Sequence, residues 1–381
     1  MTMHGTLLQL SATPLSTRHG CFTLHVFHNF ATGRYALALV CGALDGTAPV
    51  LSRVHSSCIT SEAYGGCDCD CVEQLDAALA RIAAHGRGVV FYLPQEGRGA
   101  GLAAKTRDRM LVQASRNALT TFDAYARLGL AADQRRYDEV PAMCRLLGLD
   151  APLLLLTGNP EKATMLAGDG WPVAGTQPLP LVASPFNLHY LEAKSRSGHG
   201  LTNGDRTLAA AEPPEPVTAF DPHPLPDAPR FVRLASYFLP VRLTPPVWFR
   251  LQLYFDTEEH HQRVILSYAA SPQATPLVRV HAEQLAERFV PPTRWLEVAR
   301  RIVAHGAGVV LFLDAERWGV STEYSTDSAA SLLAQHLPRG DAVLLFGRAA
   351  WDGGGTALTT ALAQHGIRIA APHALDAEWA S

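Results

Sequence analysis

Apolar positions in the first half of the chain follow two different periods. Between residues 74 and 85, Leu75, Leu79 and Ile82 recur at helical spacing, and Gly86 follows as a typical C-terminal stop. This stretch therefore predicts an amphipathic helix. Short continuous apolar runs predict buried or half-buried strands at residues 22–27, 36–40, 89–93 and 153–156. Because helical and strand patterns are interspersed, we expect a mixed α/β fold.

The chain repeats part of itself. Residues 81–93 read Arg-Ile-Ala-Ala-His-Gly-Arg-Gly-Val-Val-Phe-Tyr-Leu, and residues 301–313 read Arg-Ile-Val-Ala-His-Gly-Ala-Gly-Val-Val-Leu-Phe-Leu. Upstream of each copy, Arg53-Val-His55 is matched by Arg279-Val-His281. Such internal similarity predicts one α/β domain duplicated in tandem.

The two copies are expected to differ in chemistry. We predict a catalytic domain over residues 1–196, a linker rich in proline, glycine and alanine over 197–229, and a second copy over 230–381. Aligned by eye, Cys58 of the first copy corresponds to Gln284, and Cys69 and Cys71 correspond to Phe289 and Pro291. The second copy is therefore predicted to be a degenerate domain without metal ligands. It could complete a pseudo-twofold interface, cover the active site, bind a regulator, or serve only in packing.

Composition narrows the class of protein. The chain has 381 residues, is 48% hydrophobic and 18% charged, and has a formal net charge of −3, so no global basic field indicates a nucleic-acid polymer as partner. We find neither a signal-peptide pattern nor an apolar stretch of the roughly 20 residues that cross a bilayer. We therefore expect a cytoplasmic protein that does not bind membranes.

The cysteines suggest a metal site. All seven lie in the first 144 residues, and an odd, clustered set in such a chain argues against a disulfide framework. Cys69-Asp-Cys71, with Cys58 eleven residues before Cys69, is a spacing that suits a soft metal such as zinc. Three protein ligands leave a fourth position open, which is typical of catalytic zinc and favours a hydrolase. Cys67 lies among these ligands and could compete for the metal.

Several separated motifs occur in an order that resembles the GTP cyclohydrolase II family over roughly residues 10–200. They are Arg53-Val-His-Ser-Ser-Cys58, Cys69-Asp-Cys71, Gln95-Glu-Gly-Arg-Gly-Ala-Gly-Leu102 with Lys105, Leu128-Gly-Leu-Ala-Ala-Asp-Gln-Arg135, Thr157-Gly-Asn-Pro-Glu-Lys162 and Asn187-Leu-His-Tyr-Leu-Glu-Ala-Lys194. The resemblance implies that zinc-bound water attacks C8 of GTP, opens the imidazole ring and releases formate. Pyrophosphate is also released, and the diaminopyrimidinone ribosylamino phosphate that remains enters riboflavin biosynthesis.

The resemblance also implies roles for individual residues. Cys58, Cys69 and Cys71 would hold Zn²⁺, and Mg²⁺ is expected with the triphosphate. The catalytic pair at the phosphates would be Asp133 and Arg135, where clamping the phosphates suits arginine chemistry. The remaining substrate contacts would come from Arg53, Gln74, Glu96, Gly97, Arg98, Thr157 and Lys162. Glu96 could accept hydrogen bonds from the guanine base. Family members are homodimers, so either a homodimer or a pseudo-dimeric monomer is implied.

One departure from the family pattern bears on the product. Where the family carries a tyrosine four residues after Lys105, this chain has Arg109. That tyrosine is associated with the hydrolytic steps at the base, so an alternative is a divergent paralogue that stops at the formamidopyrimidine. A second alternative is action on another nucleotide, as in a uracil-catabolism branch that also resembles this family. A third, from another class, is a nucleotide-binding regulator without turnover. Tyr92, Tyr125 or Tyr137 could replace the missing hydroxyl.

Overall fold

The computed structural model describes residues 2–180, 182–196, 208–270, 274–281, 288–289, 294–313, 325–346 and 355–374. The chain divides into two compact units. The first comprises Met1–Asp108, Asn117–Glu212 and Arg288–Pro291, and the second comprises Arg109–Arg116, Pro213–Glu287 and Pro292–Ser381. Each unit is built around one mixed β-sheet.

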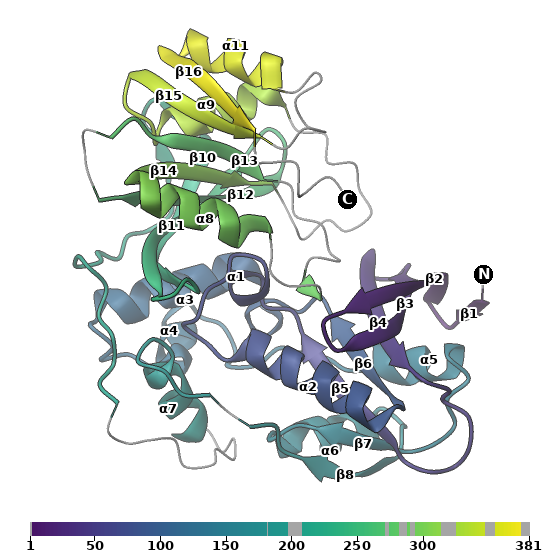
Figure 1. Ribbon diagram of the computed structural model, residues 1–381. Coiled ribbons are helices and arrows are strands. Elements are labelled where there is room, and N and C mark those ends of the chain that lie inside the picture. The colour runs from purple at the N-terminus through teal and green to yellow at the C-terminus, as the bar shows by residue number, and fades with distance from the viewer. Residues whose placement is uncertain are drawn as a thin grey trace. The chain divides into compact units, whose positions relative to one another are not determined.

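The sheet of the first unit has the strand order β1-β2-β3-β4-β6-β5-β7-β8 (Figure 1). From β1 to β4 and on to β6 the neighbours are antiparallel, whereas β6, β5, β7 and β8 run parallel. Parallel neighbours require crossovers, which helices supply. The strands are β1 (Thr2–His4), β2 (Leu7–Thr17), β3 (Gly20–Asn29), β4 (Arg34–Cys41), β5 (Val50–Ser56), β6 (Gly88–Leu93), β7 (Leu153–Leu156) and β8 (Val173–Gln177).

Helices cover both faces of this sheet. Its main core lies on the face that β6 lines with Val89 and Phe91, where residues of α5 and α6 pack. The other face carries Val90 and Tyr92 and meets α2, whose Leu75, Leu79 and Ile82 are buried as the helical pattern predicts. The helices are α1 (Ile59–Glu62), α2 (Cys71–His85), the 3₁₀ turn η1 (Gly97–Gly99), α3 (Gly101–Ala114), α4 (Thr121–Arg127), α5 (Glu139–Leu146), α6 (Pro160–Gly168) and α7 (Leu188–Arg196).

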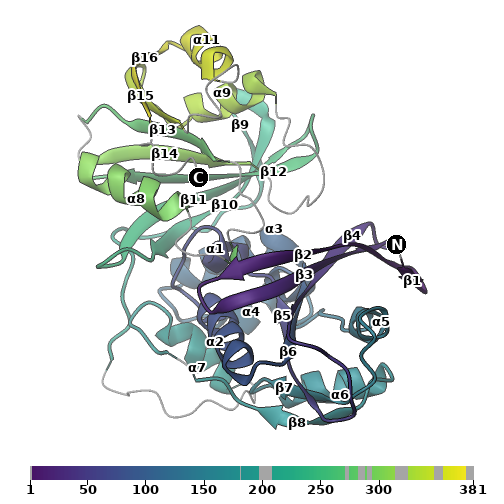
Figure 2. The same cartoon turned by 45° about the vertical axis from the view of Figure 1, so that its right-hand side comes forward.

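The sheet of the second unit repeats the first. Its order, β9-β10-β11-β12-β14-β13-β15-β16, is that of the first sheet with every number raised by eight, and each pair of neighbours has the same direction (Figure 2). The strands are β9 (His223–Leu225), β10 (Ala228–Val241), β11 (Val247–Asp256), β12 (His261–Ala269), β13 (Leu277–His281), β14 (Ala307–Phe312), β15 (Gly340–Phe346) and β16 (Ile367–Ala374). The helices described are α8 (Arg294–His305), α9 (Thr326–Ala334) and α11 (Thr356–Gln364).

The duplication holds in detail. Arg53 pairs with Val90 on the neighbouring parallel strand, and Arg279 pairs with Val310 in the same way. Arg53 donates to the carbonyl oxygen of Leu156 (2.7 Å), as Arg279 donates to that of Leu345 (3.3 Å). The α/β fold duplicated in tandem is thus confirmed.

One detail differs from the pattern-based expectations. The stretch 197–229, expected to be a linker, contains β9 and the start of β10. The strand β9 has only three residues, one of them a proline, and it pairs with β10 alone. It therefore leaves no periodic apolar signal in the sequence. The positions 284 and 291, which align with Cys58 and Cys71, lie outside the described residues.

Among the helices that the structure describes, none has the length and apolar character needed to cross a bilayer.

Candidate metal centre and pocket

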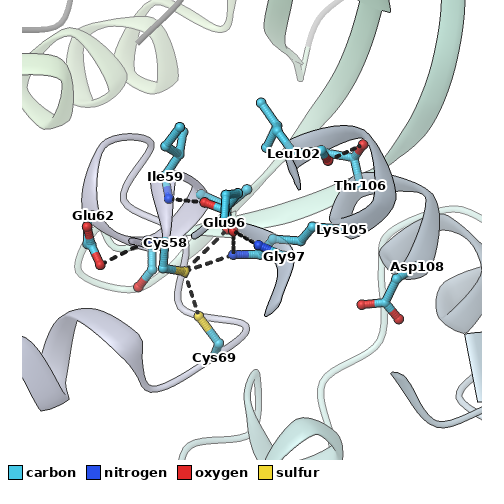
Figure 3. A network of polar contacts seen from close by, with 12 residues as sticks. Cys58, Ile59, Glu62, Cys69, Glu96, Gly97, Leu102, Lys105, Thr106 and Asp108 are labelled. Carbon is cyan, nitrogen blue, oxygen red and sulfur yellow. Dashed lines mark hydrogen bonds and ion pairs between the residues drawn. The ribbon is translucent and has the colours of Figure 1, made fainter. Parts of the chain in front are cut away.

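Three cysteine sulfurs meet where β5 ends and α2 begins. Cys58 follows β5 directly, Cys69 lies in the connecting loop, and Cys71 is the first residue of α2. All three Sγ atoms lie within 4.8 Å of one another, and those of Cys58 and Cys69 are 3.6 Å apart (Figure 3). Sulfurs bound to tetrahedral zinc at about 2.3 Å stand about 3.8 Å apart, so the spacing suits that ion.

Without a bound cation, the clustered thiols favour their protonated form. Hydrogen bonding among the sulfurs, with burial, raises the pKa of Cys58 and of Cys71 well above the usual thiol range. Because cysteines bind metals as thiolates, a divalent cation would reverse that shift on binding. Cys67 is buried nearby in sequence but is not one of the three converging sulfurs.

A buried ion pair supports Cys58 from the side of α3. Lys105 Nζ lies 2.8 Å from Cys58 Sγ and 2.9 Å from Glu96 Oε1 (Figure 3). Burial alone would lower the pKa of Lys105, but the facing Cys58 and Glu96 raise it well above its ordinary value. The ammonium therefore stays charged, and it favours the thiolate form of Cys58.

The loop that carries Glu96 is fixed to the loop that carries Asp133 and Arg135. Gln134 N donates to Arg98 O (2.9 Å), and the Gln95 side chain exchanges hydrogen bonds with the backbone of Arg136 (2.5 and 3.0 Å). At Gly99, φ is +88° and a Cβ atom would stand 2.9 Å from the carbonyl carbon and oxygen of Gln134. Only glycine permits this approach without displacing the backbone.

A second buried network lies behind Cys58. Glu62, the last residue of α1, accepts from the backbone N of Cys58 (3.1 Å) and shares a hydrogen bond with His55 Nε2 (2.7 Å). The Tyr92 hydroxyl donates to the other Glu62 oxygen. Burial lowers the pKa of His55 although Glu62 opposes this shift. His55 is therefore a support of the loop, as its position on β5 suggests, and the three-sulfur cluster does not include it.

A pocket rich in cations opens beside Cys71. Its wall includes five cationic side chains, those of Arg53, Arg98, Arg135, Lys162 and Lys194. Burial, followed by repulsion from Arg53, Arg135 and Lys194, lowers the pKa of Lys162 well below the lysine range. An anion in the pocket would relieve this repulsion. The remaining lining residues are His55, Ser56, Cys71, Gln74, Thr157, Gly158, Asn159, Leu179 and Tyr190.

The structure brings most of the predicted substrate residues to this wall. Arg53, Gln74, Arg98, Arg135, Thr157 and Lys162 all line it, and they come from five separate segments of the chain. Asp133 is not among the lining residues, but it holds the Arg135 guanidinium through both carboxylate oxygens. Gly97 is not among the lining residues either, and its carbonyl oxygen accepts from the Tyr125 hydroxyl (2.8 Å).

Glu96 occupies a different environment from the one expected. One of its oxygens accepts from Lys105 and from Gly97 N (2.8 Å), and the other accepts from Ile59 N. It is buried and is not among the residues that line the pocket. A guanine contact would have to replace one of these intramolecular donors, so the predicted role of Glu96 at the base stays a prediction.

Two lining residues on α7, Tyr190 and Lys194, were not predicted from the sequence as site residues. Tyr190 and Lys194 are four residues apart and so share one helical face. Lys194 donates to both oxygens of Asp70 (3.0 and 3.1 Å), and Asp70 also accepts from Gln74 (2.6 Å). Because Asp70 lies between Cys69 and Cys71, these contacts join the metal loop to the pocket wall. The i, i+4 spacing of an aromatic and a cation was the available sequence signal.

Arg109 and the candidate replacement tyrosines have defined surroundings. Arg109 is buried within α3. The hydroxyl of Tyr125 is engaged with Gly97 and that of Tyr92 with Glu62. The ring centroid of Tyr137 lies 5.5 Å from Nζ of the pocket-lining Lys162.

Three sulfurs at the edge of a cationic pocket define a candidate metal-dependent enzyme that acts on an anion. Comparison with known proteins also indicates an enzyme of this class. A sequence model of the GTP cyclohydrolase II family matches residues 9–178. GTP cyclohydrolase-2 of Azotobacter vinelandii is 44% identical over 191 residues, which cover 50% of this chain and 90% of that protein. GTP cyclohydrolase-2 of Yersinia pseudotuberculosis is 42% identical over 197 residues, 51% of this chain and 98% of that protein.

A solved structure of RibBX, a two-domain 3,4-dihydroxy-2-butanone 4-phosphate synthase from A. baumannii, aligns at 18% identity. The alignment covers 48% of this chain and 41% of that chain, with a TM-score of 0.26, and it carries no argument.

The chain therefore belongs to the GTP cyclohydrolase II family, and it is a hydrolase of that family. The match to the family model ends at residue 178, so it does not include the part of the second unit that begins at Pro213.

Proposed function

We propose that the first unit hydrolyses the imidazole ring of GTP at C8, with release of formate and pyrophosphate, to give a diaminopyrimidinone ribosylamino phosphate. The observation that carries this proposal is that Cys71, one of the three clustered cysteines, lines a pocket with five basic side chains. Relatives that are about 90% or more covered by this chain bear the name GTP cyclohydrolase-2.

The donor set fits zinc. Cys58, Cys69 and Cys71 would hold the ion, and Cys71 also lines the pocket. Zinc in such a site supplies hydroxide at neutral pH, because it lowers the pKa of bound water to about 7. Lys105 would favour the thiolate form of Cys58 when the ion binds and, through Glu96, fix the backbone of Ile59.

The cations would bind the triphosphate. Arginine forks match phosphate oxygens in pairs, and Arg135 is oriented for this by Asp133. Lys162, whose Nζ donates to Val54 O (2.8 Å), would regain its charge beside an anion. Among the described residues that line the pocket, none is a carboxylate, so Mg²⁺ would be held by the phosphate oxygens of the substrate.

Water accounts for every product. One water opens the ring at C8 and leaves a formamide, a second releases formate from that formamide, and a third releases pyrophosphate from the triphosphate. A second candidate outcome, retention of the formyl group, is favoured by Arg109 at the tyrosine position. The product of the full reaction would enter riboflavin biosynthesis, for which the cytoplasm is the expected compartment.

Replacing Cys69 with serine tests the metal proposal. Serine is a poor zinc ligand, so we expect Cys69→Ser to lose stoichiometric zinc and to form no formate or pyrophosphate from GTP. The matched control is Cys21→Ser, since Cys21 is an exposed thiol on β3 far from the cluster in sequence. Metal analysis and product assays are done on both variants. Product formation by zinc-free Cys69→Ser would exclude the metal mechanism.

A further inference from the structure

A short piece of the second sequence copy belongs structurally to the first unit. Residues Arg288–Pro291 fall within the repeat that starts near Leu277, yet they group with the first unit. In the alignment by eye, Phe289 and Pro291 are the positions that correspond to the two cysteines of the Cys-x-Cys pair. Of this piece, Arg288 and Phe289 are described, and both are buried.

Arg288 enters the network behind Cys58. Its guanidinium donates to the Tyr92 hydroxyl (2.7 Å), which in turn donates to Glu62. Phe289 packs edge-to-face on the ring of Tyr92, with centroids 5.2 Å apart. Tyr92 is thereby fixed both at its ring and at its hydroxyl.

The contacts continue from Tyr92 to the metal loop. Glu62 has no exposed side-chain surface, and a buried carboxylate needs both hydrogen bonds and a nearby positive charge. Its donors are Tyr92, His55 and the backbone N of Cys58. The Arg288 guanidinium approaches Glu62 through the Tyr92 hydroxyl, which accepts from Arg288 (2.7 Å) and donates to Glu62. Arg288 thus supplies countercharge to the residue that orients the Cys58 backbone.

We propose that Arg288 is a positioning residue for the metal loop, acting through Tyr92 and Glu62 on the backbone of Cys58. The degenerate copy then contributes a structural element of the catalytic site in place of its own lost ligands. This inference rests on the proposed metal site, and it adds to that site a residue that lies beyond the region matched by the family model.

The primary variant is Arg288→Met in the full chain, which keeps the length of the side chain and removes its charge and donors. Outer contacts to metal ligands typically change metal affinity about 10–100-fold, and Arg288 acts through two intermediaries, so we expect zinc release to a chelator to accelerate about tenfold. The cobalt-substituted protein should also show a shifted thiolate-to-cobalt absorption band. The matched control is Arg300→Met on α8, where the side chain is 54% exposed, and it should release zinc at the original rate.

A double-mutant cycle with Tyr92→Phe tests whether Arg288 acts on the metal loop through the Tyr92 hydroxyl. If Arg288 acts through the Tyr92 hydroxyl, Arg288→Met should change zinc release far less in the Tyr92→Phe background than in the parent. An equal change in both backgrounds overturns the proposal, as does parental zinc release by Arg288→Met. If Arg288→Met does not fold, Arg288→Lys replaces it, because a single amine keeps the charge but not the fork geometry. Parental release by that variant overturns the proposal as well.

The outcomes separate this inference from the proposed function. A parent protein that binds no zinc at the three cysteines contradicts the metal site itself. A parent that binds zinc and converts GTP, with unchanged zinc release in both Arg288 variants, contradicts only the role of Arg288.

Discussion

At the scale of single residues, the site depends on charges that the protein holds close together. Arg53, Arg135, Lys162 and Lys194 line one pocket, where burial first, and then repulsion from the other three, lowers the pKa of Lys162 well below the lysine range. Arg135 differs from Arg53 because a carboxylate, that of Asp133, binds its guanidinium through both oxygens. That pairing fixes the direction of the guanidinium fork, so Arg135 is the residue best prepared to receive phosphate oxygens.

Arg135→Ala should therefore reduce pyrophosphate release at least about tenfold, since hydrogen bonds to a charged group contribute about 1.5–3 kcal/mol each. Zinc content should be unchanged because Arg135 lies outside the cysteine cluster. The control is Arg136→Ala, in which the neighbouring side chain is 79% exposed and pairs only with Asp138 among the ion pairs described. Unchanged pyrophosphate yield in Arg135→Ala, measured with saturating GTP, would remove Arg135 from its assigned role.

Sequence reasoning reached the residues whose chemistry is visible in their type and spacing. The three cysteines were predicted as a cluster, and their sulfurs do converge. The surroundings of Glu96 could not be predicted in this way, because a carboxylate beside Gly97 and Arg98 gives no hint that Ile59 and Lys105 donate to it. Those donors come from segments that meet only in the folded chain.

At the scale of elements, the site depends on the close approach of two loops. The turn η1 contains Arg98 at φ 56° and ends at Gly99, and Gly101 lies two residues further on; φ is +88° at Gly99 and +89° at Gly101. Gly99 stands against Gln134, whereas a Cβ at Gly101 would meet nothing within 4 Å. The two glycines therefore share a backbone conformation and differ only in what lies beside them.

This pair gives a matched test of the loop contact. Both Gly99→Ala and Gly101→Ala should lose about 1–2 kcal/mol of stability from the left-handed backbone. Gly99→Ala must in addition displace Gln134 and Arg135, so it should raise KM for GTP or lower pyrophosphate yield about tenfold, with zinc retained. Steady-state kinetics and thermal unfolding of both variants provide the comparison. Equal kinetics in the two variants would show that the loop contact does not position Arg135.

The elements themselves were largely predictable where the apolar period is sustained. The predicted helix over residues 74–85 appears as α2, and the runs at 89–93 and 153–156 appear within β6 and as β7. The strand β9 was missed, because its three residues are stabilised by pairing with β10 and not by an apolar pattern of their own.

At the scale of the whole molecule, the two units have sheets of the same topology, but their described residues differ in the chemical groups that they bring together. The repeated strand order and the equivalent Arg53 and Arg279 contacts show that the duplication is structural. In the part of the chain that the structure describes, cysteines gather into a possible metal site only in the first unit. The second unit has instead a partly buried histidine, His336, whose ring packs edge-to-face on Tyr254 (5.5 Å).

His336 should make the second unit sensitive to acid. Burial, with a smaller effect of Arg233, lowers the pKa of His336 to about 4, whereas an unfolded histidine titrates near 6.5. Below pH 6.5 the unfolded chain therefore binds the proton first, and the free energy of unfolding falls, by at most about 3 kcal/mol, as the pH drops from 6.5 to 4. His336→Leu should remove this dependence, and substitution of the exposed His365 by glutamine should not. Urea unfolding followed by hydrogen exchange in β14 measures it, and an identical pH slope in His336→Leu would refute the assignment.

The central claim is that this chain opens the guanine ring of GTP with a cysteine-bound zinc. The most direct measurement incubates the zinc-loaded chain with GTP and Mg²⁺, quantifies formate and pyrophosphate separately, and determines the mass of the nucleotide product. We predict formate and pyrophosphate in equal amounts. Pyrophosphate without formate, with one water added to the purine, would identify the formamide-retaining alternative. Intact GTP and neither product, from protein that carries stoichiometric zinc, would contradict the account.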